Sequence, residues 1–147
     1  MSRKTNSLHI RELKPAEMPT LFPLIKQLNA SITRKEFNMF LQEALAGGYR
    51  CFGGFQGQKL VAACGLWVMT RFWSGKFMEI DNLVVDKSQR NSGMGKLMLD
   101  AVEKVAAKEG CQMVLAASYT HNTASHRFYF REKYIIRGFV FTKSIPA

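Results

Sequence analysis

Apolar residues recur at intervals of three and four positions in three long segments, which predicts three amphipathic helices. The segments are residues 15–29, 33–46 and 93–109. Thr33 and Glu36 stand at capping-box spacing ahead of the second segment, so that helix has a defined start. Pro19 and Pro23 lie in the first segment, and we expect that helix to begin late or to be broken near its beginning.

Runs rich in β-branched and aromatic residues predict the strands of a sheet. They occupy residues 8–11, 49–56, 59–70, 76–85 and 113–117, and we expect a pair of closing strands within 134–143 after a short helix over 122–131. Because residues 113–117 are all apolar, we expect that strand to be buried on both faces at the centre of the sheet. The expected order βααβββαβαββ describes an α+β fold with one mixed sheet, in a single domain spanning residues 1–147.

Composition narrows the class of protein. No segment approaches the roughly 18 to 20 uninterrupted apolar residues that cross a bilayer, and the first residues are polar, so we expect a cytoplasmic protein with no membrane partner. Cys51, Cys64 and Cys111 lie in apolar runs, which favours reduced thiols in the core. The three histidines have no ligand spacing, so we expect no metal.

The formal net charge of +10 raises the question of nucleic-acid binding. The lysines and arginines are spread along the chain, and no motif that reads DNA or RNA accompanies them. We therefore expect the charge to serve an anionic ligand through electrostatic steering, and a nucleic-acid partner is disfavoured.

The most informative segment follows the strand over residues 76–85 and opens the helix over 93–109. Its glycines, Gly93 and Gly95, allow a tight turn whose backbone N–H groups converge on an anion, and the helix dipole adds positive potential there. Arg90 and Lys96 add side-chain cations at the two ends of the loop. A dinucleotide fingerprint is excluded because Met98 occupies its third glycine position. The segment predicts a site for a phosphorylated cofactor.

With R-x-x-G-x-G between a strand and a helix, the chain resembles the GNAT superfamily of acyl-CoA-dependent N-acyltransferases over residues 8–143. The resemblance implies a largely antiparallel central sheet flanked by helices, with acetyl-CoA as cosubstrate. It also implies transfer of an acetyl group to a primary amine, which we expect on a small molecule, by direct attack in a ternary complex. The residues that it assigns to the cofactor are Leu83, Val84, Val85, Arg90, Asn91, Ser92, Gly93, Met94, Gly95, Lys96 and Asn122.

Direct attack requires a base for the ammonium and an acid for the departing thiolate. Glu79 and Asp81 are candidates for the base, because alternate strand residues share a face and paired carboxylates raise one another's pKa; which of them acts is left open. Tyr129 stands seven residues after Asn122, and the resemblance makes its hydroxyl the proton donor to the CoA thiolate. Backbone N–H groups of Leu83 and Val85 are candidates for holding the acetyl carbonyl.

The end of the chain departs from the family pattern. Lys133 stands where relatives commonly have a glycine, which puts the local turn geometry in question. The amino-acid sequence of residues 126–134 and 141–143 resembles that of the aminoalkylphosphonate N-acetyltransferases. Cations in the segments expected near the acceptor favour an anionic amine; they are Arg34, Lys35, Arg71 and Lys76. The alternatives are a protein or peptide N-acetyltransferase and a non-catalytic basic module for nucleic acid, and a homodimer is left open.

Overall fold

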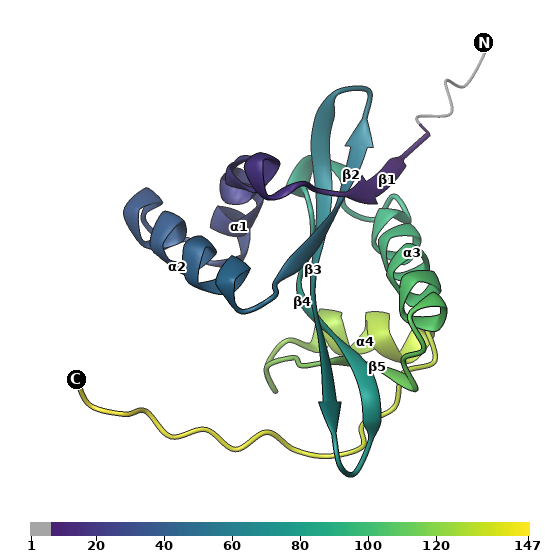
Figure 1. The fold of residues 1–147 in the computed structure, drawn as a ribbon. Helices are drawn as coiled ribbons and strands as arrows, with labels where there is room; N and C mark the ends of the chain where they lie inside the picture. The colour runs from purple at the N-terminus through teal and green to yellow at the C-terminus, as the bar shows by residue number, and fades with distance from the viewer. Residues whose placement is uncertain (1–6) are drawn as a thin grey trace. The chain divides into compact units, whose positions relative to one another are not determined.

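The structure is a computed structural model that describes residues 7–147 (Figure 1). The chain divides into two compact units, one running to Leu115 and the other from Ala116 to Ala147, and each is described by itself. The first unit holds β1 (His9–Glu12), the 3-10 helix η1 (Pro15–Leu21), α1 (Phe22–Leu28), α2 (Arg34–Ala46), β2 (Arg50–Gln56), β3 (Lys59–Arg71), β4 (Gly75–Val85), the 3-10 helix η2 (Lys87–Gln89) and α3 (Met94–Lys108). Strand β5 (Met113–Ala116) reaches the boundary, and the second unit holds α4 (Thr123–Arg131).

The strands form one five-stranded sheet in the order β1-β2-β3-β4-β5. Neighbours from β1 to β4 pair antiparallel, and β3 with β4 makes the longest ladder. The predicted hairpin of β2 and β3 is present, and it turns at Gly57, whose φ of +59° suits a residue without a Cβ. The α+β class with a largely antiparallel sheet is confirmed.

Helices cover both faces of this sheet. Figure 1 shows α1 and α2 on one side and α3 on the other. On the α1 and α2 side, Leu24 and Phe37 are buried in a core cluster that also includes Cys51 of β2. On the other side, Met98 and Val102 of α3 are fully buried. The two apolar layers follow from the periodicity of the helices and the alternation of the strands.

The local signals at the helix ends act as expected. The Glu36 backbone N–H donates to Thr33 Oγ1 at 3.2 Å, while the Thr33 backbone N–H donates to Glu36 Oε2 at 2.8 Å, so the predicted capping box is formed. The proline-containing segment begins as the 3-10 helix η1 and becomes α-helical at Phe22, which confirms the late start.

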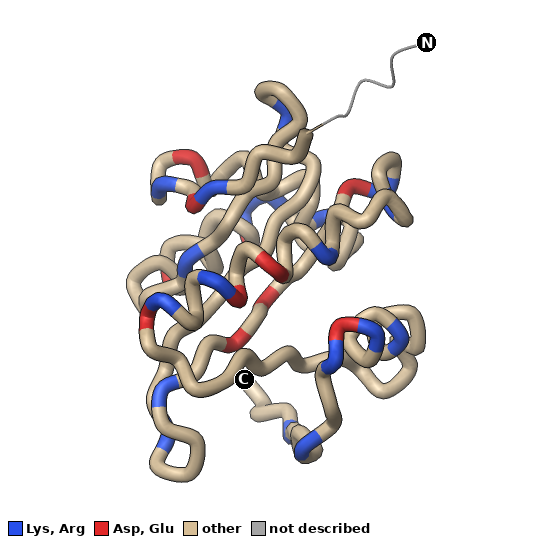
Figure 2. The backbone as a smooth tube through the Cα atoms, turned by 90° about the vertical axis from the view of Figure 1, so that its right-hand side faces the viewer, with Lys and Arg blue, Asp and Glu red and all other residues tan. Residues whose placement is uncertain are grey.

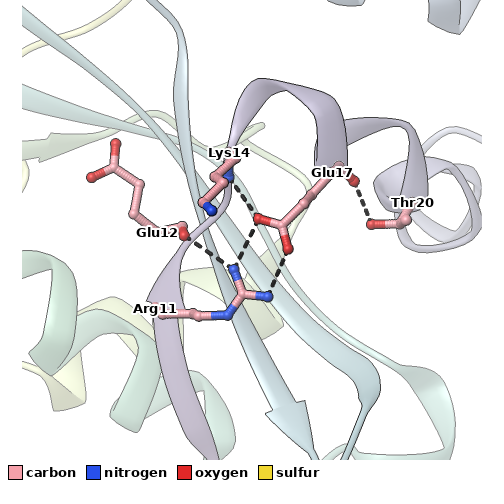
Figure 3. A network of polar contacts seen from close by, with 5 residues as sticks. All are labelled: Arg11, Glu12, Lys14, Glu17 and Thr20. Carbon is pink, nitrogen blue, oxygen red and sulfur yellow. Dashed lines mark hydrogen bonds and ion pairs between the residues drawn. The ribbon is translucent and has the colours of Figure 1, made fainter.

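An ion pair joins β1 to η1 (Figure 3). Arg11 meets both carboxylate oxygens of Glu17 at 2.7 and 2.9 Å, and the Lys14 backbone N–H donates to the same carboxylate at 2.8 Å. These contacts lower the pKa of Glu17 to about 2, chiefly through the hydrogen bond from Arg11. The entry into the first helical segment is thus held by a bidentate charged pair.

The cysteines behave mostly as predicted. Cys51 and Cys64 are buried free thiols, whereas Cys111 is half-buried. Burial raises the pKa of Cys51 to about 12, so this thiol stays protonated at neutral pH.

Two expectations about the last strands are wrong. Residues 135–147 form no regular strand in the structure, so the expected closing strands within 134–143 are absent there. All four residues of β5 are half-buried, although we expected a strand buried on both faces. Both errors have one physical reason: strand formation depends on a neighbouring strand and a covering layer, which local composition does not specify.

Candidate functional site

An irregular stretch of backbone lies in the middle of β4. Ala63 of β3 pairs with Val84 and Gly65 pairs with Asp81, so Asn82 and Leu83 together face a single residue of β3. This is a β-bulge, and Asn82 adopts a left-handed φ of +57° within it. A bulge interrupts the ladder and leaves backbone groups available to a ligand. The resemblance assigned Leu83 to the cofactor, but it did not indicate the bulge.

Buried side chains hold the bulge from the α1 and α2 side of the sheet. Tyr49 is buried, its ring lies 5.4 Å from that of Trp67, and a hydrogen bond joins its hydroxyl to the side chain of Asn82. Burial raises the pKa of Tyr49, so its hydroxyl remains protonated. Gly65 permits this approach, because a Cβ built there would lie 2.2 Å from the Tyr49 hydroxyl and 2.5 Å from the Asp81 carbonyl oxygen. Sequence reasoning missed this contact between distant residues.

The two candidate carboxylates lie on the same strand as the bulge. Glu79 pairs with Trp67 across the β3–β4 ladder, and Asp81 pairs with Gly65. Both are half-buried, and they share a face of the sheet because they are two residues apart. The Trp67 indole N–H donates to Asp81 Oδ2 at 3.1 Å, whereas the described residues give the Glu79 carboxylate no hydrogen bond. Asp81 is therefore oriented by a neighbour, and Glu79 keeps its acceptor capacity for a ligand.

The predicted anion loop begins the third long helix. Gly93 is the N-cap of α3 with a left-handed φ of +81°, and no side chain caps the helix there. A Cβ built on Gly93 would meet nothing within 4 Å, so the space beside the loop is open. Asn91 is also left-handed, with φ +62°, and Met94 is buried, which anchors the first turn. The loop therefore leaves first-turn N–H groups available to an anion.

The segment between the β4 bulge and the loop at the start of α3 is held by residues that the sequence did not single out. The Asp86 carboxylate accepts hydrogen bonds from the backbone N–H and hydroxyl of Ser88 at 2.9 and 2.7 Å, which lower its pKa. Its own backbone N–H donates to the Val61 carbonyl at 2.8 Å. From α1, Gln27 Oε1 accepts from the Lys87 backbone N–H at 2.9 Å. The Asp86-x-Ser88 spacing is a turn signature that identifies part of this arrangement.

The two cations expected at the loop, Arg90 and Lys96, differ in their exposure and contacts. Arg90 is exposed, while Lys96 Nζ lies 2.9 and 3.0 Å from the carboxylate oxygens of Asp100, one turn along α3. Ser92 donates its hydroxyl to the Gln89 carbonyl and so closes the loop on itself. The backbone of the loop, more than Lys96, is therefore placed to meet phosphate oxygens.

Asn122 and Tyr129 belong to the second unit. Asn122 is the N-cap of α4, and its Oδ1 accepts from the Ser125 backbone N–H at 3.2 Å. Tyr129 is half-buried, with its ring 5.3 Å from Phe128 and 5.2 Å from Tyr134. Lys133 has a φ of +69°, so the turn keeps the left-handed conformation although a lysine replaces the family's glycine.

The cations proposed for an anionic acceptor have structural contacts of their own. The Arg34 guanidinium lies 4.1 Å from the Phe22 ring centre, and that of Arg71 lies 4.5 Å from the Phe77 ring centre. Lys76 Nζ donates to the Glu109 carbonyl at 2.7 Å. In Figure 2 the lysines and arginines are scattered along the chain. Their contacts explain part of the basic composition through packing.

Within residues 7–147, no three His, Cys, Asp or Glu side chains gather closely enough to hold a metal ion. None of the helices in that range combines the length and apolar character needed to cross a membrane.

The chain is similar to known acetyltransferases in sequence and in fold. The acetyltransferase (GNAT) family model matches residues 12–133. The N-acetyltransferase YhdJ of Bacillus subtilis (strain 168), described as uncharacterized, is 23% identical over 141 residues, which cover 94% of this chain and 99% of that protein. The aminoglycoside N-acetyltransferase AAC(6')-Iy in complex with CoA matches with a TM-score of 0.85 at 15% identity, over 100% of both chains. The ribosomal-protein-alanine N-acetyltransferase from Brucella melitensis biovar Abortus 2308 matches with a TM-score of 0.81 at 13% identity, over 95% of this chain and 100% of that one.

Proposed function

Because the chain belongs to the acetyltransferase (GNAT) family, we propose that it transfers the acetyl group of acetyl-CoA to a primary amine of a small molecule. The reaction is direct attack of the amine on the acetyl carbonyl in a ternary complex, which releases CoA as the thiol. The observation that carries this proposal is the open, left-handed Gly93 loop at the start of α3, which follows the bulged strand β4. A neighbour of the same fold is described in complex with CoA, which supports the cosubstrate.

The pyrophosphate of acetyl-CoA binds the loop over residues 90–96 in this proposal. Backbone N–H groups after Gly93 and the positive end of the α3 dipole supply the attraction, and exposed Arg90 adds a cation. Leu83, Val84 and Val85 continue the cofactor site along β4, where the bulge frees the Leu83 backbone for the acetyl carbonyl. Asn122 remains a proposed cofactor contact in addition to capping α4.

The proton transfers divide between three side chains. We assign the base to Glu79, directly or through a water, because Trp67 already occupies one oxygen of Asp81. Asp81 then acts by fixing the indole and the charge beside Glu79. Tyr129 is the proposed acid, because it occupies the position of the family's tyrosine seven residues after Asn122, and a phenol suits protonation of a thiolate.

A binding measurement tests the cofactor site. Calorimetry with acetyl-CoA and CoA should show binding to the wild type, and Gly93→Asp should abolish it, because the substitution places a carboxylate against the pyrophosphate. Gly110→Asp is the matched control, since Gly110 at the other end of α3 also has a positive φ of +77° and open space around a built Cβ. Equal loss in both variants contradicts the assignment of the loop. Absence of wild-type binding at millimolar ligand contradicts the proposed function itself.

Kinetics test the proton transfers. Tyr129→Phe should lower kcat by roughly 10 to 10³ with little change in KM for acetyl-CoA, because proton donation matters in the transition state. Glu79→Gln should remove the fall of kcat/KM at low pH, whereas the wild type keeps it. An unchanged kcat in the first variant, or an unchanged pH profile in the second, removes that residue from the mechanism.

The proposal for the acceptor names a class of compound, the primary amines of small molecules. One neighbour of the same fold is described as an aminoglycoside N-acetyltransferase, and another as a ribosomal-protein-alanine N-acetyltransferase. Enzymes of this fold therefore include some named for small-molecule acceptors and some named for protein acceptors. A panel of aminoglycosides, polyamines, aminoalkylphosphonates and peptides with free N-termini, read by thiol release, separates the classes. Turnover of peptides alone would replace the small-molecule proposal by the protein one. Steep salt-dependent binding of DNA or RNA without affinity for CoA would favour the nucleic-acid module suggested by the charge of +10.

A further inference from the structure

Tyr49 carries a buried polar group that no step of the proposed reaction uses. The residue is 8% exposed, and its hydroxyl lies directly over Gly65, in the space that a Cβ would fill. The Asp81 carbonyl oxygen borders the same space, and all three residues belong to the first unit. Burying a hydroxyl is unfavourable unless it is hydrogen-bonded, so the partners of this hydroxyl indicate what it does.

The Tyr49 hydroxyl is hydrogen-bonded to two side chains, those of Asn82 and Cys51. Burial raises the pKa of Tyr49 most, the bond with Asn82 lowers it, and the bond with Cys51 raises it. A donor to the phenol oxygen stabilises the phenolate, whereas an acceptor stabilises the phenol. The Asn82 amide N–H therefore donates to the hydroxyl oxygen, and the hydroxyl donates to Cys51 Sγ.

The ring of Tyr49 is held in place as well. It lies 5.4 Å from the Trp67 ring, at an interplanar angle of 56°. Trp67 in turn lies against Gly47 at the end of α2, where a built Cβ would be 3.3 Å from the indole, and its N–H donates to Asp81 Oδ2 at 3.1 Å. The hydroxyl therefore meets Asn82 from a fixed position.

Asn82 connects Tyr49 to the proposed site of the acetyl carbonyl. Asn82 and Leu83 together face one residue of β3, and Asn82 has a left-handed φ of +57°. The Leu83 N–H belongs to the peptide bond between these two residues, which moves as one rigid plane. Rotation about the backbone dihedrals of Asn82 therefore redirects the Leu83 N–H, and a hydrogen bond on the Asn82 side chain restricts that rotation.

We propose that Tyr49 is a positioning residue for acetyl transfer, because its hydroxyl holds Asn82 and thereby keeps the Leu83 N–H aimed at the acetyl carbonyl. This inference rests on the proposed function, in which that N–H stabilises the oxygen of the carbonyl as it becomes negative. A donor of this kind accelerates the reaction to the extent that it is already oriented when the charge develops. Tyr49 acts through Asn82 and exchanges no proton with either substrate.

Tyr49→Phe tests the proposal, because it removes the hydroxyl and keeps the ring. Well below the melting temperatures, kcat should fall about 10-fold with an unchanged KM for acetyl-CoA, a smaller loss than the roughly 10² to 10³ that removal of an oxyanion donor costs. Val102→Ala is the control, since it opens a cavity at a fully buried side chain of α3 and should keep the wild-type kcat. An unchanged kcat in Tyr49→Phe, or an equal fall in the control, overturns the proposal.

A double-mutant cycle tests the route through Asn82. Asn82→Gly removes the side chain, and glycine tolerates the φ of +57° at this position. This variant should also lower kcat about 10-fold, and adding Tyr49→Phe to it should change kcat by less than about 2-fold, because both substitutions remove the same hydrogen bond. Losses that multiply to about 100-fold would show that Tyr49 acts by another route, which overturns the proposal.

The carbonyl of bound acetyl-CoA gives a readout that needs no acceptor amine. A hydrogen bond to this carbonyl moves its ¹³C resonance downfield, so acetyl-CoA labelled at that carbon should resonate downfield of the free compound on the wild type. In Tyr49→Phe the resonance should move back towards the free value. An identical resonance in the two proteins overturns this inference and leaves the proposed acetyl transfer intact. A wild type that binds no acetyl-CoA contradicts the proposed function, and the inference fails with it.

Discussion

Replacing Gly65 by alanine tests the contact that holds the bulge of β4. The new Cβ would lie 2.2 Å from the Tyr49 hydroxyl and 2.5 Å from the Asp81 carbonyl oxygen, both far inside normal contact. Neither neighbour moves easily, because one is backbone in the β3–β4 ladder and the other is a buried ring packed 5.4 Å from Trp67. Overpacking of a core costs about 1–3 kcal/mol, and two simultaneous clashes place Gly65→Ala near about 3 kcal/mol. For a chain of this length that lowers Tm by about 9 °C, at about 3 °C per kcal/mol.

Thermal unfolding followed by circular dichroism measures this effect. Gly138→Ala is the control, because a Cβ built there meets nothing within 4 Å and its φ is not left-handed. We expect the control to stay within about 0.5 kcal/mol of the wild type. Gly65→Ala should also lower kcat, since relief of the clash with the Asp81 carbonyl shifts the backbone that presents Leu83. A variant that melts with the wild type and retains its activity would refute the reasoning that Tyr49 and Gly65 fix the bulge.

Two further substitutions test the charged pair and the strained turn. The Arg11 contact lowers the folded-state pKa of Glu17 to about 2, so its stabilisation is present above the unfolded-state pKa of about 4.3 and disappears as the pH falls towards 2. Urea midpoints of wild type and Glu17→Gln should therefore differ at neutral pH and converge in that acidic range, and a gap that stays constant would contradict the pairing. Lys133→Gly should raise Tm by a few degrees, because a non-glycine residue at φ +69° costs about 1–2 kcal/mol, partly offset by the greater freedom of glycine in the unfolded chain. An unchanged or lowered Tm in differential scanning calorimetry would show that the lysine is not strained.

The helices and the tight turn at Gly93 were predictable because their signals are local. Thr33 and Glu36 stand three residues apart and cap each other within one turn, so the pair can be read without knowledge of the fold. Gly93 is likewise a local signal, since a left-handed N-cap selects a residue without a Cβ, and the structure gives it a φ of +81°. The left-handed turn at Lys133 was not predictable, because the residue type argues against the conformation that the chain adopts.

The bulge and the end of the sheet depend on contacts between distant residues. At the bulge, Tyr49 is hydrogen-bonded to the Asn82 side chain and Gly65 pairs with Asp81, and both partners come from other parts of the chain, so the sequence of residues 79–85 does not indicate these contacts. Residues 139–142 have the composition of a strand, yet the structure assigns no strand there, because a strand also needs an edge beside it, which composition does not specify.

Strand β4 unites the parts of the site that lie in the first unit. Its middle is held from one side through Tyr49 and Gly65, and its end is held through the Asp86 backbone on Val61 and through Gln27 on Lys87. These two anchors bracket the bulge and lead directly into the loop that starts α3. Since Lys96 is already paired with Asp100, we propose that backbone groups fixed by these anchors contribute most to placing an anionic cosubstrate. Backbone N–H groups held in this way lose little freedom when they bind, so the proposed site would be preorganised for phosphate without needing a cluster of cations.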